Sequence, residues 1–486
     1  MVFSSPVFMF IFLPLVFFVV TGVMLIKCKP AVKIANCLLL AASLFFYAWG
    51  EPVLILFMIW VTLLCYLFAL VIERFNNSDH PKKQAFRTAA LVISLVVSLG
   101  VLFFYKYAGF ASQVLTGKAL NIPLPLGISF YTFQALSYVI DVYKGKAKAS
   151  KNFAKVLLYV SLFPQLVAGP IVKYQDVEAQ LEERSLNAEQ VACGLRRFIC
   201  GLSKKMLIAN TVAVMADSVF SLGAAELTGA AAWCGAIAYL FQIYFDFSGY
   251  SDMAIGLGAM FGFRFNENFD YPYKSLSIKE FWRRWHISVS SWFKEYLYFP
   301  LGGNRKGRFR TCINKIIVFF FTGLWHGANF TFIVWGLWHG FFLLLEEYIP
   351  KPKKAIKSMP VKIITYGLRY IYTMLVVIVG FVIFRADTLS YGITFVGKMF
   401  ADFGKLPESL GPALATADVY TGIIFIAAVV LSFPVSRIIM KKAERKGGAV
   451  KNVVEVMSFG GAAVLFIACV LCLASSSYNP FIYFRF

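Results

Sequence analysis

Apolar stretches long enough to cross a membrane recur along almost the whole chain, and short loops that carry basic residues separate them. A helix needs about 20 apolar residues to cross the hydrocarbon layer, which is roughly 30 Å thick. The 486-residue chain is 59% hydrophobic and only 15% charged, whereas a soluble domain is about 45–50% apolar with roughly a quarter of its residues charged. The pattern predicts an all-α, multi-pass membrane protein and excludes a soluble enzyme with one anchor.

The distribution of Lys and Arg predicts the direction in which each segment crosses the membrane, because short cytoplasmic loops carry the excess of positive charge. Placing the loop with Arg74, Lys82 and Lys83 inside puts both the N-terminus and the turn at residues 49–52 outside. The resulting scheme has about 9 to 11 transmembrane helices, plus re-entrant or broken helices around a central tunnel, and both termini outside. Residues 123–146 and 419–436 are among the predicted full spans.

Two apolar segments are predicted to be broken rather than continuous. Residues 156–172 contain Pro164, Gly169 and Pro170, and residues 316–346 are too long for one span and have basic flanks. Irregular backbone at membrane depth must be surrounded by protein or water. We expect a re-entrant hairpin at the first segment and two half-helices that meet around residues 325–327 at the second. Since no repeat divides the chain, residues 1–486 are predicted to form one membrane-embedded domain.

The net charge of +22 comes largely from loops, so we interpret it as topogenic and expect no nucleic-acid partner. The longest basic segment, residues 263–315, alternates Arg and Lys with aromatic residues in "FWRRWHISVSSWFKEYLYFPLGG". This composition is typical of an amphipathic segment at the membrane interface. We expect the segment on the cytoplasmic side, in contact with the lipid bilayer.

Two histidines are the candidates for catalysis. His326 lies inside an apolar segment, where an ionisable residue indicates function by default, and imidazole suits general-base chemistry near neutral pH. The alternative is a neutral histidine that is hydrogen-bonded between helices. For His286, beside Trp285 in the basic segment, the functional and structural interpretations are equally open. His339 lies late in an apolar helix, where packing alone explains it.

Polar residues within the apolar run 231–262 form a second candidate group. Asp246 and Ser248 should face the protein interior, where they shape a substrate pocket or hold helices together. The sequence contains no Gly-x-Ser-x-Gly elbow, no phosphate-binding loop and no clustered metal ligands, so we expect no metal and no tightly bound cofactor. A histidine acting on two bound substrates is the simplest remaining chemistry. The candidate substrate-binding residues are Trp325, Asn329, Asp246, Ser248, Arg283 and Arg284.

Six long stretches follow one another along the chain: "PLGISFYTFQALSYVIDVYKG", "LFPQLVAGPIV", "YFDFSGYSDMAIGLGAMFGF", "FWRRWHISVSSWFKEYLYFPLGGNRKG", "TGLWHGANFTFIVWGLWHG" and the C-terminal "NPFIYFRF". Together they resemble the membrane-bound O-acyltransferase family, specifically its bacterial, alginate O-acetyltransferase-like branch. The resemblance covers nearly the whole chain, and the opening "MVFSSPVFMFIFLPLVF" looks most like the alginate-type members.

The resemblance implies acyl transfer, most simply of acetyl, with His326 as the essential histidine and His286 as the second. It implies a tunnel through the helices, in which a cytoplasmic thioester, acetyl-CoA or a carrier-borne acyl group, meets an acceptor reached from outside. That acceptor is a cell-surface polysaccharide or an extracytoplasmic acyltransferase partner of the SGNH, serine esterase-like type, and the location is the bacterial cytoplasmic membrane. Two alternatives stay open: D-alanyl transfer to teichoic acid, and a transporter of an acylated intermediate.

Overall fold

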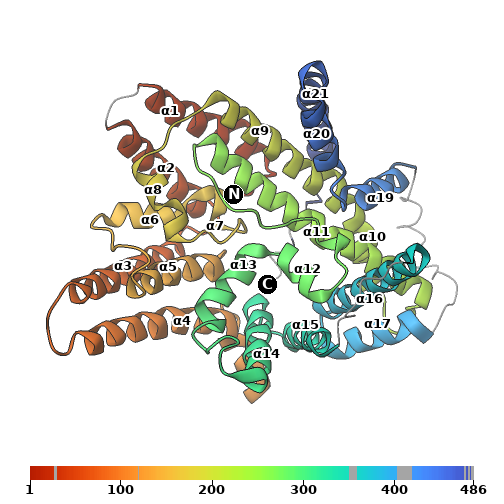
Figure 1. The fold of residues 1–486 in the computed structure, drawn as a ribbon, viewed down its shortest axis with the longest axis horizontal. Helices are drawn as coiled ribbons and strands as arrows, with labels where there is room; N and C mark the ends of the chain where they lie inside the picture. Colours follow the sequence, from red (N-terminus) through yellow and green to blue (C-terminus); the bar gives the residue numbers. More distant parts are fainter. Residues whose placement is uncertain are drawn as a thin grey trace. The chain divides into compact units, whose positions relative to one another are not determined.

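The computed structural model describes residues 1–26, 30–118, 120–349, 358–401, 419–475, 478–479 and 482, and in these ranges every regular element is helical (Figure 1). Nine helices in the described ranges are long and apolar enough to cross a membrane. The predicted fold class is therefore confirmed, and the nine candidate spans fall within the predicted range of about 9 to 11. These helices cover Phe8–Leu25, Ala31–Ala48, Ile55–Asn76, Lys83–Thr116, Ala188–Phe220, Gly229–Met260, Phe330–Tyr348, Met359–Arg385 and Gly448–Ser475.

The chain forms two compact units, one from Met1–Ile199 with Tyr250–Glu267 and the other from Cys200–Gly249 with Asn268–Phe486. In the first unit, α3 (Ile55–Asn76) packs against α4 (Lys83–Thr116) and α5 (Ile128–Tyr143). Every residue of α5 from Ile128 to Val142 is buried. At 1.5 Å per residue this helix is about 24 Å long, shorter than the hydrocarbon layer. The full span predicted over 123–146 is thus a short, internal helix.

The predicted break in residues 156–172 is confirmed. The helix α6 (Phe153–Ser161) is followed by the one-turn α7 (Phe163–Leu166) and then by non-helical residues before α8 (Tyr174–Glu182). Pro164 stands at the start of α7, where its missing N–H costs nothing. Gly169 is required sterically, because a Cβ there would lie 2.5 Å from the Cα of Gln165.

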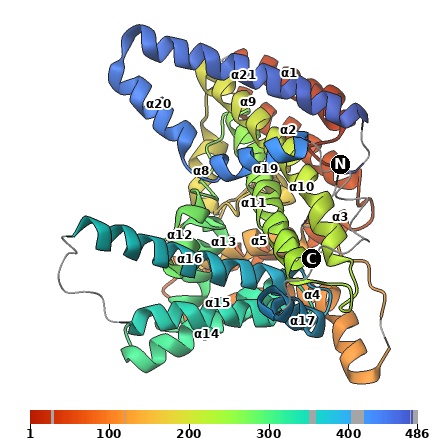
Figure 2. The ribbon, with the colours of Figure 1, turned by 90° about the vertical axis from the view of Figure 1, so that its right-hand side faces the viewer.

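In the second unit, the long apolar run 316–346 divides into α14 (Gly307–His326) and α15 (Phe330–Tyr348), as the sequence predicts. The first helix ends because Gly327 is extended, and Asn329 starts the second by accepting the Thr331 N–H at 3.0 Å, as helix-capping residues do. Figure 2 shows α15 between α14 and α16 (Met359–Arg385), against both of which it packs. His326 therefore lies at the end of a helix, inside the packed unit.

The continuous span predicted over 419–436 is wrong. The structure has two helices there, α19 (Val419–Leu431) and α20 (Val435–Lys446), with a bend of 58° between them. Pro434 precedes α20, and a proline lacks the N–H that a continuous helix requires. The basic segment 263–315 forms short helices before α14 begins: η3 (Pro272–Lys274), α12 (Ile278–Arg284), α13 (Ile287–Phe293) and η4 (Lys294–Tyr298).

Candidate active site

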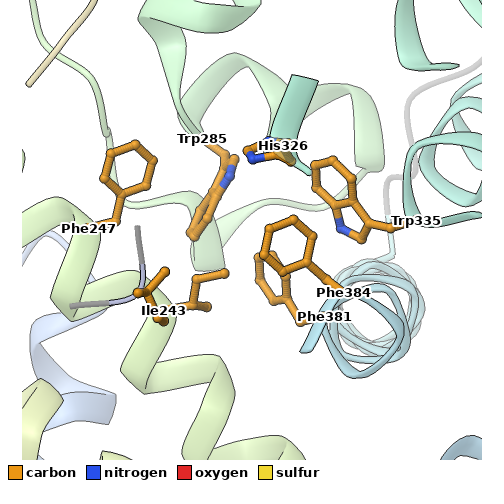
Figure 3. A pocket seen from close by; sticks show the side chains of 8 residues that line it. Ile243, Phe247, Trp285, His326, Trp335, Phe381 and Phe384 are labelled. Atoms are coloured by element: carbon orange, nitrogen blue, oxygen red, sulfur yellow. The ribbon is translucent and has the colours of Figure 1, made fainter. Parts of the chain in front are cut away.

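His326 lines a small pocket that lies entirely within the second unit (Figure 3). The space between the lining side chains is about the size of one water molecule. Apart from the imidazole, every lining residue is apolar or aromatic. The walls come from α11 (Gly229–Met260), from the turn after α12, from α15 and α16, and from the C-terminal segment: Ile243, Phe247, Trp285, Trp335, Phe381, Phe384 and Ile482.

Three aromatic rings surround the imidazole of His326. Its ring meets Trp335 edge-on at 5.0 Å, Phe384 at 5.2 Å and the neighbouring Trp325 at 4.8 Å between ring centroids. The side chain is 7% exposed. In such a dry setting, electrostatic interactions with a reacting group are stronger than they are in water. The site thus suits proton transfer that excludes bulk solvent.

His286 is held in a strained backbone conformation. Its φ is +44° and ψ is +54°, a left-handed conformation just before α13, which costs a residue with a side chain about 1–2 kcal/mol. Asn268 supports the turn: its Oδ1 lies 3.1 Å from Nδ1 of His286 and accepts from the N–H and hydroxyl of Ser288 at 3.2 and 2.9 Å. Such strain is found preferentially at functional sites.

Burial also determines the charge of His286. The side chain is 1% exposed, and because burial disfavours the imidazolium form, it lowers the pKa of His286 from its usual 6.5 to about 3. His286 is therefore neutral at physiological pH. In that state it can orient a polar group or accept a hydrogen bond, but it carries no positive charge.

The structure brings the two candidate histidines into one aromatic cluster. The ring centroid of Trp325 lies 5.9 Å from that of His286 and 4.8 Å from that of His326. Phe247, which lines the pocket, also contacts His286 at 4.6 Å. Of the predicted site residues, His286, Trp325 and His326 thus lie together, although the sequence separates His286 from the other two.

The remaining predicted binding residues lie outside this cluster, and their roles stay predictions. Asn329 caps α15, and its Nδ2 donates to the carbonyl of Asp387 at 2.9 Å. Arg284 is bound to Asp270 and, at 2.9 Å, to Glu280, whereas Arg283 is exposed. Ser248 is buried, and within the described part of the chain its hydroxyl has no hydrogen-bond partner. His339, which we interpret as structural, packs against Phe281 and Trp282.

Asp246 makes contacts that the sequence does not predict. Its Oδ1 lies 2.7 Å from Nζ of Lys205, and its Oδ2 accepts the N–H of Ile482 at 2.8 Å. Lys205 within the apolar run 190–220 is the sequence signal for such a buried partner. Ile482 carries no such signal, because only folding brings it to the pocket. Among the described residues, no three His, Cys, Asp or Glu side chains are arranged to hold a metal ion.

Known proteins match this chain along its whole length. The sequence profile of the membrane-bound O-acyltransferase family matches residues 147–383, which include both histidines. A "Probable alginate O-acetylase" of Pseudomonas putida is 40% identical over the full length of both chains. The peptidoglycan O-acetyltransferase of Helicobacter pylori is 36% identical over 80% of this chain and 78% of its own. The teichoic acid D-alanyltransferase of Bacillus subtilis is 26% identical over 53% and 68%, respectively.

Proposed function

The chain belongs to the membrane-bound O-acyltransferase family, and on that premise we propose that it transfers an acetyl group from a cytoplasmic thioester to a hydroxyl group outside the membrane. Membrane acyl transfer is the activity common to its relatives. The observation that carries the proposal for this chain is His326, a buried imidazole beside a small apolar pocket. In the proposed reaction, residues of this chain bind the substrates, transfer the proton and exclude water.

In the proposed step, His326 acts as the general base. Its imidazole accepts the proton of the acceptor hydroxyl while the hydroxyl oxygen attacks the thioester carbonyl carbon. A C–O bond forms and the C–S bond breaks. The leaving thiolate then takes the proton from the imidazolium, so that the products are an ester and a free thiol. Neutral His286, joined to His326 through Trp325, orients one of the two substrates.

The pocket favours acetyl over D-alanyl as the transferred group. A space of about one water molecule between apolar side chains suits a methyl group. A D-alanyl group would place its ammonium among these rings, and burying a charge without a partner is costly. Among the described residues that line the pocket, none is a carboxylate that could pair with an ammonium.

The donor is proposed to be acetyl-CoA or a carrier-borne acetyl thioester, bound as a substrate rather than as a resident cofactor. Both are anionic, and the segment 263–315 exposes Arg283, Arg305, Lys306, Arg308 and Arg310, whose charge would attract them. The positive-inside distribution supports a cytoplasmic position for this segment.

The acceptor is proposed to be a cell-surface polysaccharide. The acetyl group would cross the membrane in a tunnel and pass to the polysaccharide either directly or through an SGNH-type extracytoplasmic partner. Two relatives that cover most of this chain are named for O-acetylation of alginate and of peptidoglycan, both polymers outside the cytoplasm. The bacterial cytoplasmic membrane is the corresponding location. The proposal of an SGNH-type partner is supported by the resemblance to the family.

The test uses membrane vesicles from cells that express the full chain, supplied with radiolabelled acetyl-CoA, an acetylated carrier protein or a D-alanylated carrier protein. We expect thiol release and label in polymer or partner with an acetyl donor. Transfer from the D-alanyl donor alone would mean that the transferred group is D-alanyl and not acetyl. Solute flux without thiol release would mean that the chain is a transporter and not a transferase.

A further inference from the structure

A buried ion pair beside the His326 pocket connects three distant parts of the second unit. Lys205 and Asp246 are 2.7 Å apart, and their side chains are 4% and 3% exposed. The second carboxylate oxygen of Asp246 accepts the backbone N–H of Ile482 at 2.8 Å. Ile482 is itself one of the residues that line the pocket. One carboxylate thus holds an internal lysine and the C-terminal segment at the same time.

The local structure places both charges next to the pocket wall. Asp246 lies on α11 between Ile243 and Phe247, which both line the pocket. Lys205 belongs to the π-helical segment η2 (Lys204–Ala209). Such π-helical turns are rare in proteins, and those that occur are often found at functional sites. Gly249 allows α11 and η2 to approach, because a Cβ there would lie 3.2 Å from the backbone nitrogen of Lys205.

A second carboxylate fixes the same C-terminal segment a few residues earlier. The hydroxyl of Tyr478 donates to Oδ2 of Asp217 at 2.6 Å, and Arg385 binds the Oδ1 of Asp217 at 2.6 Å. Arg385 directly follows Phe384, another residue of the pocket wall. Asp217 belongs to α10 (Asn210–Phe220). Tyr478 and Ile482 are therefore each bound by a carboxylate of the unit.

The ion pair is better explained by positioning than by stability. Removing two charges from water costs more than their attraction usually returns, so apolar residues often replace buried pairs without loss. The best-supported role of such pairs is to fix one arrangement among several. Here the arrangement that the pair fixes includes one wall of the pocket.

We propose that Lys205 and Asp246 are positioning residues of this acyltransferase: their ion pair fixes the backbone of Ile482, whose side chain closes the acyl pocket beside His326 and limits the length of the acyl group. The proposal rests on the proposed function, because it takes this pocket as the place of the transferred group. Neither residue needs to contact the reacting atoms. Both act through Ile482.

The first test replaces the pair by apolar residues of similar volume, in Lys205→Met with Asp246→Leu. This variant should fold and keep its thermal stability, since no charge is left buried alone. Without an acceptor for the Ile482 N–H, we expect kcat for acetyl-CoA to fall by roughly 10- to 100-fold, as a misplacement of about 1 Å does. The preference for acetyl-CoA over butyryl-CoA should fall as well. The matched control replaces the pair between α14 and α15, in Lys315→Met with Glu347→Leu, and should keep that preference.

A second variant tests the same contact with both charges in place. Ile482→Pro removes the N–H that Asp246 accepts and also changes the side chain, whereas its control Ile482→Val keeps the N–H and most of the side chain. We expect Ile482→Pro to reproduce the loss of acyl selectivity and Ile482→Val to behave like the wild type. Because Pro is introduced near the chain end, this variant decides the question if the double variant fails to fold.

Wild-type selectivity in Ile482→Pro, or in a folded double variant, would overturn the proposal. His326→Ala is measured in parallel with the same vesicles and donors. If turnover does not depend on His326, the proposed function fails. If turnover depends on His326 but the acyl preference does not change in the Lys205, Asp246 and Ile482→Pro variants, only the proposed positioning role fails.

Discussion

At the scale of the residue, Asn268 explains how the strained His286 is held. One side-chain oxygen serves the imidazole of His286, the backbone N–H of Ser288 and the Ser288 hydroxyl. Asn268→Ala should leave buried polar groups unsatisfied, at a cost of about 1–3 kcal/mol. Ser288→Ala, which removes one of these bonds, should cost only about 1 kcal/mol. Tryptophan fluorescence during unfolding in detergent measures both, and equal losses would contradict this account.

The lowered pKa of His286 gives a pH dependence with a definite sign. The native state holds His286 neutral down to about pH 3, whereas the unfolded chain takes up a proton below about 6.5. The contribution of His286 to stability is thus complete above pH 6.5 and is lost as the pH falls toward 3. Between pH 7 and pH 5 the loss is about 2 kcal/mol. His286→Asn, which tolerates a positive φ, should lose that much less stability than the wild type over the same interval.

At the scale of the element, the closeness of α14 and α15 depends on glycines that face the other helix. A Cβ on Gly323 would lie 2.3 Å from the carbonyl oxygen of Phe332, so Gly323→Ala must push the helices apart and move His326 away from Trp335. We expect loss of both transfer and thermal stability. Gly367→Ala on α16 is the control, because nothing lies within 4 Å of a Cβ there. Equal behaviour of the two variants would contradict the packing.

The sequence predicts the break between these helices but not the bend at Pro434. The run around residue 326 is too long for one span, and its length therefore indicates a break. The run at 419–436 has the length of one span, so only Pro434, which lacks the N–H that a continuous helix requires, marks the bend. Residues 123–146 show the opposite error: hydrophobicity indicated a span, but the helix is short and buried within its unit.

At the scale of the whole molecule, the predicted orientation assigns each loop to one side of the membrane. The loop with Arg74, Lys82 and Lys83 should be cytoplasmic because of its positive charge. Alkaline phosphatase fused after Ser78 should then be inactive, and a fluorescent protein fused there should fluoresce. Fusions after Glu51 should behave in the reverse way. An active phosphatase at Ser78 would invert the orientation.

The limits of sequence-based prediction follow from distance along the chain. Helical spans and the candidate histidines are local signals, since each depends on residues within one segment. The contact of Asp246 with Ile482 joins residues that only tertiary folding brings together. The same is true of Phe381 and Phe384, which differ in no way in the sequence from apolar residues that face lipid. The residues of the pocket wall therefore cannot be predicted from the sequence, although His326 can.

If His326 takes the proton of the acceptor, its loss must lower the rate of acetyl transfer, which is measured in His326→Ala. The rate should fall by about 10²–10⁴, the usual contribution of a general base. His339→Met controls for the loss of a buried imidazole from the same region and should lower stability with less than a roughly tenfold effect on rate. Wild-type transfer by a stably folded His326→Ala protein would contradict the account.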